Sequence, residues 1–342
     1  MRRAGAALAS AAAALLTGSA VVLTVGIADA RAFSPVTDGF DVLCTPTDPG
    51  LDELSGMVVV GDRLYGIGDS GNDDVVLEMG TDCHVHRRIP VPIDPYDVED
   101  LASLDGALVL SDTGDNLRTR TTVALVTMDP DTGEGDLHRL TYPDGPHDAE
   151  SLLLGPDGRP FIVTKELFGA SAVYTPANNE TTGELARPGP TALKRVGTVT
   201  AGSEKASSGT VGSVLFTGGA VSAGGEVLAL RTYTDVYLYR IVDGDVGATL
   251  VDTEPVATIP TPAEPQGESV AFTESGDLLI GSEAAGGDLP PIHIARGVVD
   301  ALAPARDATS SSRHWTTIVW AGLAVGVVGV GLLSTRSRRL RG

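Results

Sequence analysis

Aromatic and basic residues are both scarce in this chain. Tryptophan, tyrosine and phenylalanine make up 4% of the 342 residues, and 24 lysines and arginines stand against 45 aspartates and glutamates. The net charge of −21 understates the acidity of the middle, because many of the arginines lie near the two ends. A surface this acidic repels nucleic acid, so we expect no nucleic-acid partner. It suits cation binding or simple solubility.

Helix-forming runs are missing from the middle of the chain and occur only near the ends. The middle instead holds most of the 42 glycines and 21 prolines, which mark turns between short apolar runs. This composition predicts an all-β body.

The first residues have the pattern of an export signal. Arg2 and Arg3 precede an Ala/Leu/Val-rich stretch over residues 4–28, and Ala28-Asp29-Ala30 offers small residues at the spacing that a signal peptidase reads. We expect a signal peptide over 1–32, cleaved after Ala30 or Ala32. Because the apolar stretch is long, an uncleaved anchor is the alternative.

A second apolar run lies near the other end. Residues 315–333 hold no charge, begin with Trp315 and are followed by an arginine-rich tail over 334–342. Such a run predicts a single transmembrane helix, and the positive-inside rule puts the tail in the cytoplasm. We therefore expect a cell-membrane protein with its body over 33–300 outside and a polar stalk over 301–314.

Cysteine is almost absent, with only Cys44 and Cys83 in the chain. In an exported protein such a pair is usually oxidised, so we expect one disulfide between them.

The body contains an internal repeat. Segments 52–70, 98–112, 149–165 and 267–283 share an acidic residue, an apolar run, a Gly/Asp turn, a second apolar run and a charged residue; a degenerate copy lies at 219–231. The equivalent positions are Ser55, Asp100, Ser151, Val221 and Ser269. Most lie roughly 45 to 50 residues apart, a spacing typical of four-stranded propeller blades. The sequence thus predicts a five-bladed β-propeller, with six blades as the alternative.

The ends of the body fit this circular plan. The last repeat supplies about three strands before residue 301, and residues 40–44 offer the missing strand. Pairing of the two would close the circle and remove exposed sheet edges.

In a propeller, equivalent positions of the innermost strands converge on a central channel. Glu99, Glu150 and Glu268, with Asp100, are therefore expected to line it. The same alignment puts several charged residues near the ends of the second strands: Asp69, Asp112, Lys165, Arg231 and Glu283.

Two explanations of this charge remain open. The channel carboxylates either hold a cation or form a network of ion pairs with Lys165 and Arg231; paired acid and base catalysis is a third use. Asp112, Asp115 and Asn116, with Asp69, offer the oxygen ligands that Ca²⁺ or another divalent cation prefers. The alternative is that they are ordinary turn residues.

Several motifs together resemble a family of exported, membrane-anchored bacterial β-propeller proteins, many of them actinobacterial. The resemblance spans about Leu51 to Ile294 and rests on Val98-Glu99-Asp100-Leu101-Ala102, Gly114-Asp115-Asn116, Tyr142-Pro143-Asp144-Gly145, Asp148-Ala149-Glu150-Ser151-Leu152, Val163-Thr164-Lys165, Leu230-Arg231-Thr232-Tyr233 and Pro265-Gln266-Gly267-Glu268-Ser269. It implies a propeller fold and little about chemistry. This chain departs from the family at Gly219-Ala220, where an acidic residue is more usual. A more distant analogy of fold connects it to lactonase and phytase-like propellers.

Two functions follow as hypotheses. In the first, the propeller is a surface-tethered scaffold that binds a protein or small-molecule ligand on one face, with an acidic channel that holds a cation. In the second, it is a metal-dependent hydrolase of the lactonase, phosphoesterase or phytase-like esterase type, with Glu99, Glu150, Glu268 and Asp112 as candidate ligands.

Overall fold

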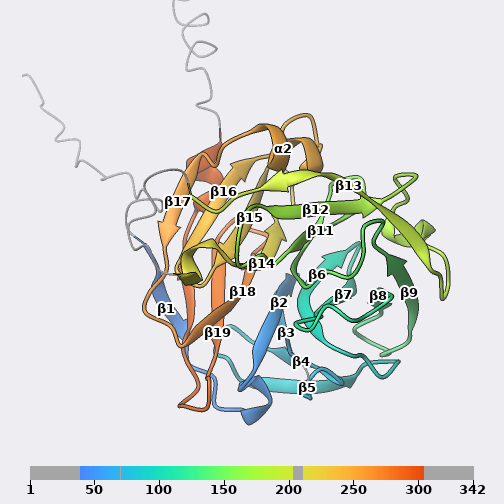
Figure 1. Cartoon of the computed structure of the whole chain (residues 1–342). Helices are drawn as coiled ribbons and strands as arrows, with labels where there is room; N and C mark the ends of the chain where they lie inside the picture. The colour runs from blue at the N-terminus through green and yellow to red at the C-terminus, as the bar shows by residue number, and fades with distance from the viewer. Residues whose placement is uncertain (1–38, 70, 203–210, 304–342) are drawn as a thin grey trace, which may run out of the picture. The chain divides into compact units, whose positions relative to one another are not determined.

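The computed structural model describes residues 39–69, 71–202 and 211–303, which belong to one unit of the chain. Short strands dominate these residues (Figure 1). The innermost strands are β2 (Leu54–Val60), β6 (Val98–Leu104), β10 (Ala149–Leu154), β14 (Phe216–Val221) and β18 (Gln266–Phe272). The second strands are β3 (Arg63–Gly68), β7 (Ala107–Asp112), β11 (Pro160–Thr164), β15 (Val227–Thr232) and β19 (Leu278–Glu283).

The strands further from the centre complete the sheets. The third strands are β4 (Val75–Met79), β8 (Val123–Met128), β12 (Ser171–Pro176), β16 (Asp235–Arg240) and β20 (Ile292–Ala295). The outer strands are β5 (Val85–Pro90), β9 (Gly135–Thr141), β13 (Thr191–Val199), β17 (Ala257–Pro260) and β1 (Asp41–Cys44).

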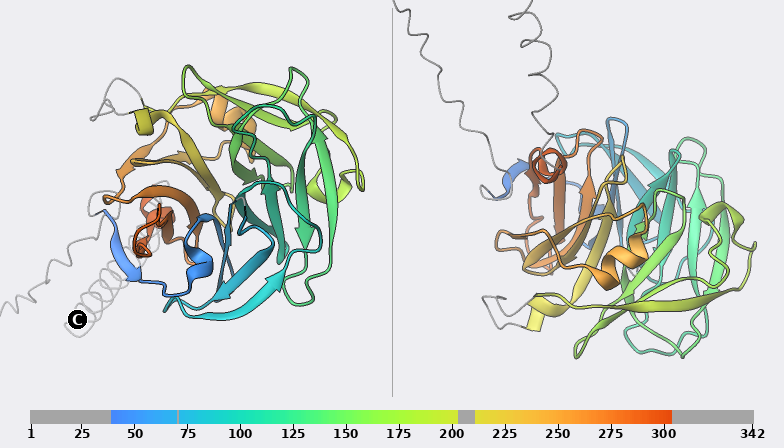
Figure 2. Two further views of the ribbon diagram at one scale, coloured as in Figure 1. Left: turned by 60° about the horizontal axis from the view of Figure 1, so that its bottom comes forward. Right: turned by 90° about the horizontal axis from the view of Figure 1, so that it is seen from above.

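The innermost strands surround a common axis. Strand β2 contacts β6, and the contacts continue through β10, β14 and β18 until β18 meets β2 again. Within each group of four the strands pair antiparallel, and the groups fan outward from the centre (Figure 2). This is the arrangement of a β-propeller, so the predicted all-β propeller class is confirmed.

Apolar side chains fill the wedges between neighbouring groups of strands. Leu153 and Phe161, for example, pack against Leu228 and Tyr237 of the next group, and all four are buried. Five such clusters each draw on two consecutive groups. Burial of apolar surface at about 25 cal/mol per Å² is the main force that holds the ring together.

The circle closes as the sequence predicts. Strand β1 pairs antiparallel with β20, so the start of the body completes the sheet that ends it. Cys44 at the end of β1 forms the expected disulfide with Cys83, which lies between β4 and β5. The bond therefore joins the last sheet of the ring to the first.

Two neighbouring sheets also join at their outer edges. Strand β13 pairs parallel with β9 through Thr191 and Ala192, so the two groups form one eight-stranded sheet. Repeat analysis did not predict this pairing. It covers an edge that would otherwise expose unpaired backbone groups.

Each innermost strand contains a β-bulge near its start. The irregularity falls at Ser55, Glu99, Glu150 and Thr217, and at Glu268 with its neighbour in β18. A bulge adds one unpaired residue and re-aims its side chain. In β14 Thr217 therefore corresponds to Glu99 and Glu150, and Gly218 to Asp100 and Ser151. The sequence-based choice of Val221 and Gly219-Ala220 was wrong because Gly218 and Gly219 leave no side-chain pattern to align. The choice of Ser55 was one position early, because Ser55 corresponds to Glu99.

Helices occupy few of the described residues. The sequence predicts none in the body, yet α2 (Val246–Asp252) is capped by Asp245, whose carboxylate accepts from Ala248 N. The others are α3 (Val298–Leu302) and the short 3₁₀ turns η1 (Pro49–Leu51), η2 (Thr182–Glu184) and η3 (Val211–Val214). None of the helices described is long and apolar enough to cross a membrane. The predicted signal peptide, transmembrane helix and tail, and most of the stalk, lie outside the described residues.

Candidate functional site

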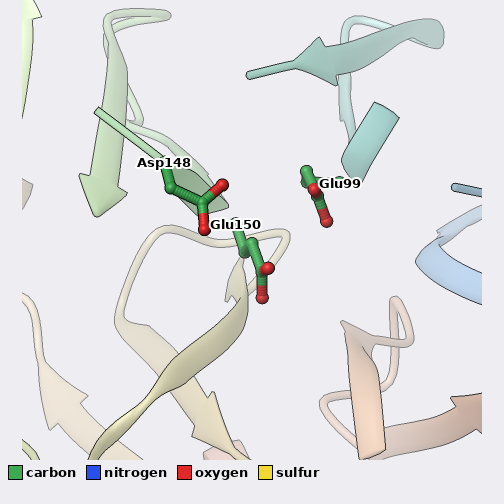
Figure 3. A group of neighbouring side chains, drawn as sticks. All are labelled: Glu99, Asp148 and Glu150. Carbon is green, nitrogen blue, oxygen red and sulfur yellow. The ribbon is translucent and has the colours of Figure 1, made fainter. Parts of the chain in front are cut away.

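Three buried carboxylates meet at the end of the channel where the innermost strands begin. Glu99 on β6, Glu150 on β10 and Asp148, just before β10, each place one oxygen within 4.8 Å of the other two. Figure 3 shows Glu99 opposite Glu150, with Asp148 beside Glu150. We call these three residues the carboxylate cluster. Their exposed fractions are 3% to 6%.

The bulges explain how these side chains converge. Glu99 and Glu150 are the extra residues of β6 and β10, so the backbone turns both toward the channel. Gly114 makes room for Glu99, because a Cβ atom there would lie 2.2 Å from a Glu99 oxygen. Ser55 and Thr217, at the corresponding bulges of β2 and β14, instead donate hydrogen bonds to backbone carbonyls of the next strand, Glu99 O and Gly267 O.

A lysine side chain lies beside the cluster. Lys165, after β11, donates from Nζ to Glu150 Oε1 at 2.5 Å. Burial disfavours the charged lysine, but Glu150 outweighs that effect and raises the pKa of Lys165 above its ordinary value. The second oxygen, Glu150 Oε2, is buried and has no hydrogen-bond partner among the described residues.

The charge of the cluster is therefore poorly compensated. Burial, followed by the charge of Glu150, raises the pKa of Glu99 well above its ordinary value. Burial likewise raises the pKa of Glu150, although Lys165 acts in the opposite direction. Burial also raises the pKa of Asp148. Three carboxylates held this close, with one lysine paired to Glu150, favour a bound cation.

Further carboxyl groups surround the same end of the channel. Burial and a hydrogen bond with Glu53 raise the pKa of Asp69 to about 8. Burial and a hydrogen bond with Glu268 raise the pKa of Glu283 to about 9. Asp97, two residues before Glu99, has a pKa raised to about 6 by burial and by Asp148. We call this end of the channel, with its carboxyl groups, the acidic mouth.

Asp100 blocks the channel below the mouth. It is fully buried, and its carboxylate accepts from the backbone N–H groups of Leu101, Leu152 and Gly219 at 2.7–3.0 Å. Burial raises the pKa of Asp100, and these three donors oppose the shift. Beyond it lies a separate cavity of about 330 Å³, lined by side chains such as Ala102, Val221 and Phe272.

Arg231 lies between two sheets and not in the cluster. Its guanidinium is fully buried, is paired with Glu264, and donates to the carbonyls of Ser269 and Gly281. Of the two predicted basic partners, Lys165 contacts a channel glutamate, whereas Arg231 holds β15 against β18 and β19.

The loop residues whose oxygens suggested a calcium site instead form hydrogen bonds and an ion pair with nearby protein groups. Asp112 accepts from Asp97 N and pairs with Arg120, and Asp115 accepts from the backbone of Thr119 and Arg120. Asn116 is exposed. Of the four residues that the sequence suggested as loop ligands, these three do not join the cluster, and Asp69 belongs to the surrounding mouth. The carboxylates of Asp112 and Asp115 shape the loop that holds Gly114.

The sequence analysis missed Asp148, Asp97 and Glu53 as site residues. Each lies two positions before a bulge residue, at Asp148-Ala149-Glu150, Asp97-Val98-Glu99 and Glu53-Leu54-Ser55. Alternate residues of an extended strand share a face. That period-two pattern was visible in the sequence and would have predicted all three.

Comparisons with known proteins add only distant structural similarities to this geometry. Neither the protein-family models nor the curated proteins include a match to the chain. Among solved structures, a gluconolactonase from Xanthomonas campestris shares 15% identity at a TM-score of 0.39, and the comparison covers 75% of this chain and 94% of that one. A streptogramin B lyase shares 8% identity at a TM-score of 0.41, covering 75% and 96%.

Proposed function

We propose that this protein is an exported, five-bladed β-propeller that binds one divalent cation, Ca²⁺ or an ion of similar chemistry, in its acidic mouth. The observation that carries the proposal is the carboxylate cluster, in which three buried oxygens lie within 4.8 Å of one another and Glu150 Oε2 has no partner among the described residues. Calcium binds oxygens at about 2.3–2.6 Å, so oxygens of one coordination shell are at most about 5 Å apart.

With a cation bound at this point, the propeller would act as a ligand-binding module. A bound cation would offset the burial and the repulsion that raise the pKa of Glu99 and Glu150, and it would offer a ligand in the mouth a positive charge to coordinate. Protein surfaces of this kind hold a partner or small molecule through the cation and the surrounding loops.

Calorimetric titration of metal-free, full-length protein with calcium tests the proposal. We expect one site per chain, and a loss of affinity of at least tenfold in Glu150→Gln, which keeps the shape and removes a charged ligand. Glu180→Gln is the matched control, because Glu180 binds only its own exposed turn. Equal calcium affinity in wild type and Glu150→Gln would contradict the assignment.

One observation favours a hydrolase as the second candidate. Asp97 lies two residues from Glu99, and burial and Asp148 raise its pKa to about 6, so it would be placed to act as a general base where a cation held by the cluster would supply an activated water. Turnover of a panel of esters, lactones and phosphoesters that needs calcium and is lost in Asp97→Asn would support this function. Absence of turnover by calcium-loaded protein would exclude it for those substrates.

The count of five blades and the membrane tether are parts of the same proposal. The closed ring of five innermost strands supports five blades, each half of the eight-stranded sheet being counted as one. The disulfide suits an oxidising compartment outside the cytoplasm. Protease added to intact cells should remove the propeller and leave the 334–342 tail protected; full protection of the propeller would contradict this topology.

A further inference from the structure

Large apolar side chains are exposed on three loops of the acidic mouth. Phe168 is 85% exposed, Leu117 84%, Tyr96 67% and Leu167 47%. Tyr96 precedes β6, Leu117 lies between β7 and β8, and the other two lie between β11 and β12. These connections are at the end of the ring where the innermost strands start. We call the four residues the apolar rim.

The same loops hold the carboxylate cluster. Lys165, which donates to Glu150, is two residues before Leu167, and Asp115, whose N–H donates to Asp148, is two residues before Leu117. Since two or three residues span at most about 10 Å, the rim stands within reach of a small ligand bound at the cluster.

Contacts between the loops join the rim into one surface. Arg118, next to Leu117, pairs with Glu166, next to Leu167, at 2.8 Å. Arg120 lies 4.7 Å above the ring of Tyr96 and pairs with Asp112. Tyr96 and Arg120 also line a cavity of about 470 Å³, which extends from Tyr96 to Leu137 and Arg139 of the outer strand β9.

The charge of the mouth limits which ligands fit. A divalent cation and Lys165 together balance the three charges of the cluster, but Asp97 and Glu268 add further carboxyl groups beside Glu99. An anionic ligand would meet these at close range. Neutral hydroxyl or carbonyl oxygens complete the coordination of a hard cation without that repulsion.

We propose that the acidic mouth binds a neutral, amphipathic ligand, whose hydroxyl or carbonyl oxygens coordinate the cation while its apolar chain or ring packs on Tyr96, Leu117, Leu167 and Phe168. This inference rests on the proposed cation site and adds the chemical class of the ligand.

The test compares three probes on calcium-loaded, full-length protein by calorimetry: 1,2-octanediol, 1,2-propanediol and octanoate. Octanediol should bind at least tenfold more tightly than propanediol, because its longer chain buries more apolar surface. It should also bind at least tenfold more tightly than octanoate, which has an eight-carbon chain but carries a charge.

Variants separate the rim from the cation. Phe168→Ser should weaken octanediol binding at least fivefold and leave calcium affinity unchanged. Val256→Ser is the matched control, because Val256 is 47% exposed between α2 and β17, away from these loops, and should change neither.

Each contrary result has a distinct meaning. Calcium binding with equal affinity for the two diols, or with unaltered octanediol binding in Phe168→Ser, overturns the rim as a binding surface. Tighter binding of octanoate overturns the neutral class of ligand. Absence of calcium binding overturns the proposed function, and this inference with it.

Discussion

The carboxylate of Asp100 on β6 accepts a hydrogen bond from the backbone N–H of Gly219 on β14 at 3.0 Å, although 119 residues separate the two. The same oxygen accepts from Leu152 N on β10 at 2.7 Å, so one side chain joins three innermost strands. It also separates the acidic mouth from the cavity at the other end of the channel.

Asp100→Asn should therefore destabilise the fold. An amide has a single acceptor oxygen, and its NH₂ group would face backbone N–H donors that are hydrogen-bonded in the wild type. We therefore expect the free energy of unfolding to fall by about 2–3 kcal/mol. Urea unfolding followed by circular dichroism measures it. Asp105→Asn, in an exposed turn of the same sheet, is the control and should change little. Equal midpoints for the two variants would show that Asp100 is not a structural link.

Lys165→Met should separate the structural and cation-binding roles of the mouth. Without calcium, loss of the buried partner of Glu150 should lower the free energy of unfolding by about 3 kcal/mol. Calcium should restore more stability than in wild type, because the competing positive charge is gone and Glu150 is free to bind the ion. Thermal melts with chelator and with calcium test this. Lys194→Met serves as the control, because the Lys194 ammonium donates to Asn179 at the surface and not to a cluster residue. An identical calcium effect in both variants would contradict a cation at Glu150.

The metal-free protein should become less stable as the pH rises. Burial and neighbouring carboxylates raise the pKa of Asp97 to about 6, of Asp69 to about 8 and of Glu283 to about 9. Between an ordinary carboxyl pKa near 4 and these values, the folded protein holds protons that the unfolded chain releases. Their stabilising contribution is full at low pH and is lost as the pH rises through the folded values.

Thermal melts in chelator between roughly pH 5 and pH 9 measure this dependence. We expect Tm to fall steadily over that range, and calcium to flatten the slope by replacing protons as the counter-charge. A Tm that rises with pH in chelator would contradict the raised pKa values.

The disulfide should stabilise the closure of the ring. Cys44 and Cys83 are 39 residues apart, and loss of a crosslink of that length typically costs about 2–4 kcal/mol. The double variant Cys44→Ser, Cys83→Ser should show this loss in urea unfolding, and reductant should lower the wild type to the same value. A reductant effect on the double variant itself would point to another cause.

The repeat allowed much of this structure to be predicted. Apolar runs and Gly/Asp turns indicate the strands. Equivalent positions in a propeller must converge, so the sequence alone predicts that Glu99 and Glu150 lie close together. The pairing of β1 with β20 followed from the need to close the circle, and the Cys44–Cys83 bond from the expected oxidation of the two cysteines of an exported chain.

The parts that escaped prediction depend on long-range contacts or on missing side chains. Glu264 lies in the segment before β18 and meets Arg231 only once two sheets pack, so no local pattern connects them. Thr217 was missed because glycines follow it, and the bulge that marks its position leaves no trace in composition. Asp148, Asp97 and Glu53 are the exceptions, since their alternation with the bulge residues was readable.

An anomalous difference map from crystals grown with Mn²⁺ in place of calcium tests the central claim most directly. The account predicts one strong peak per chain among the oxygens of Glu99, Asp148 and Glu150, at about 2.1–2.6 Å from each, with further coordination positions open toward the mouth. A map without a peak there, with Lys165 still the partner of Glu150, would contradict it.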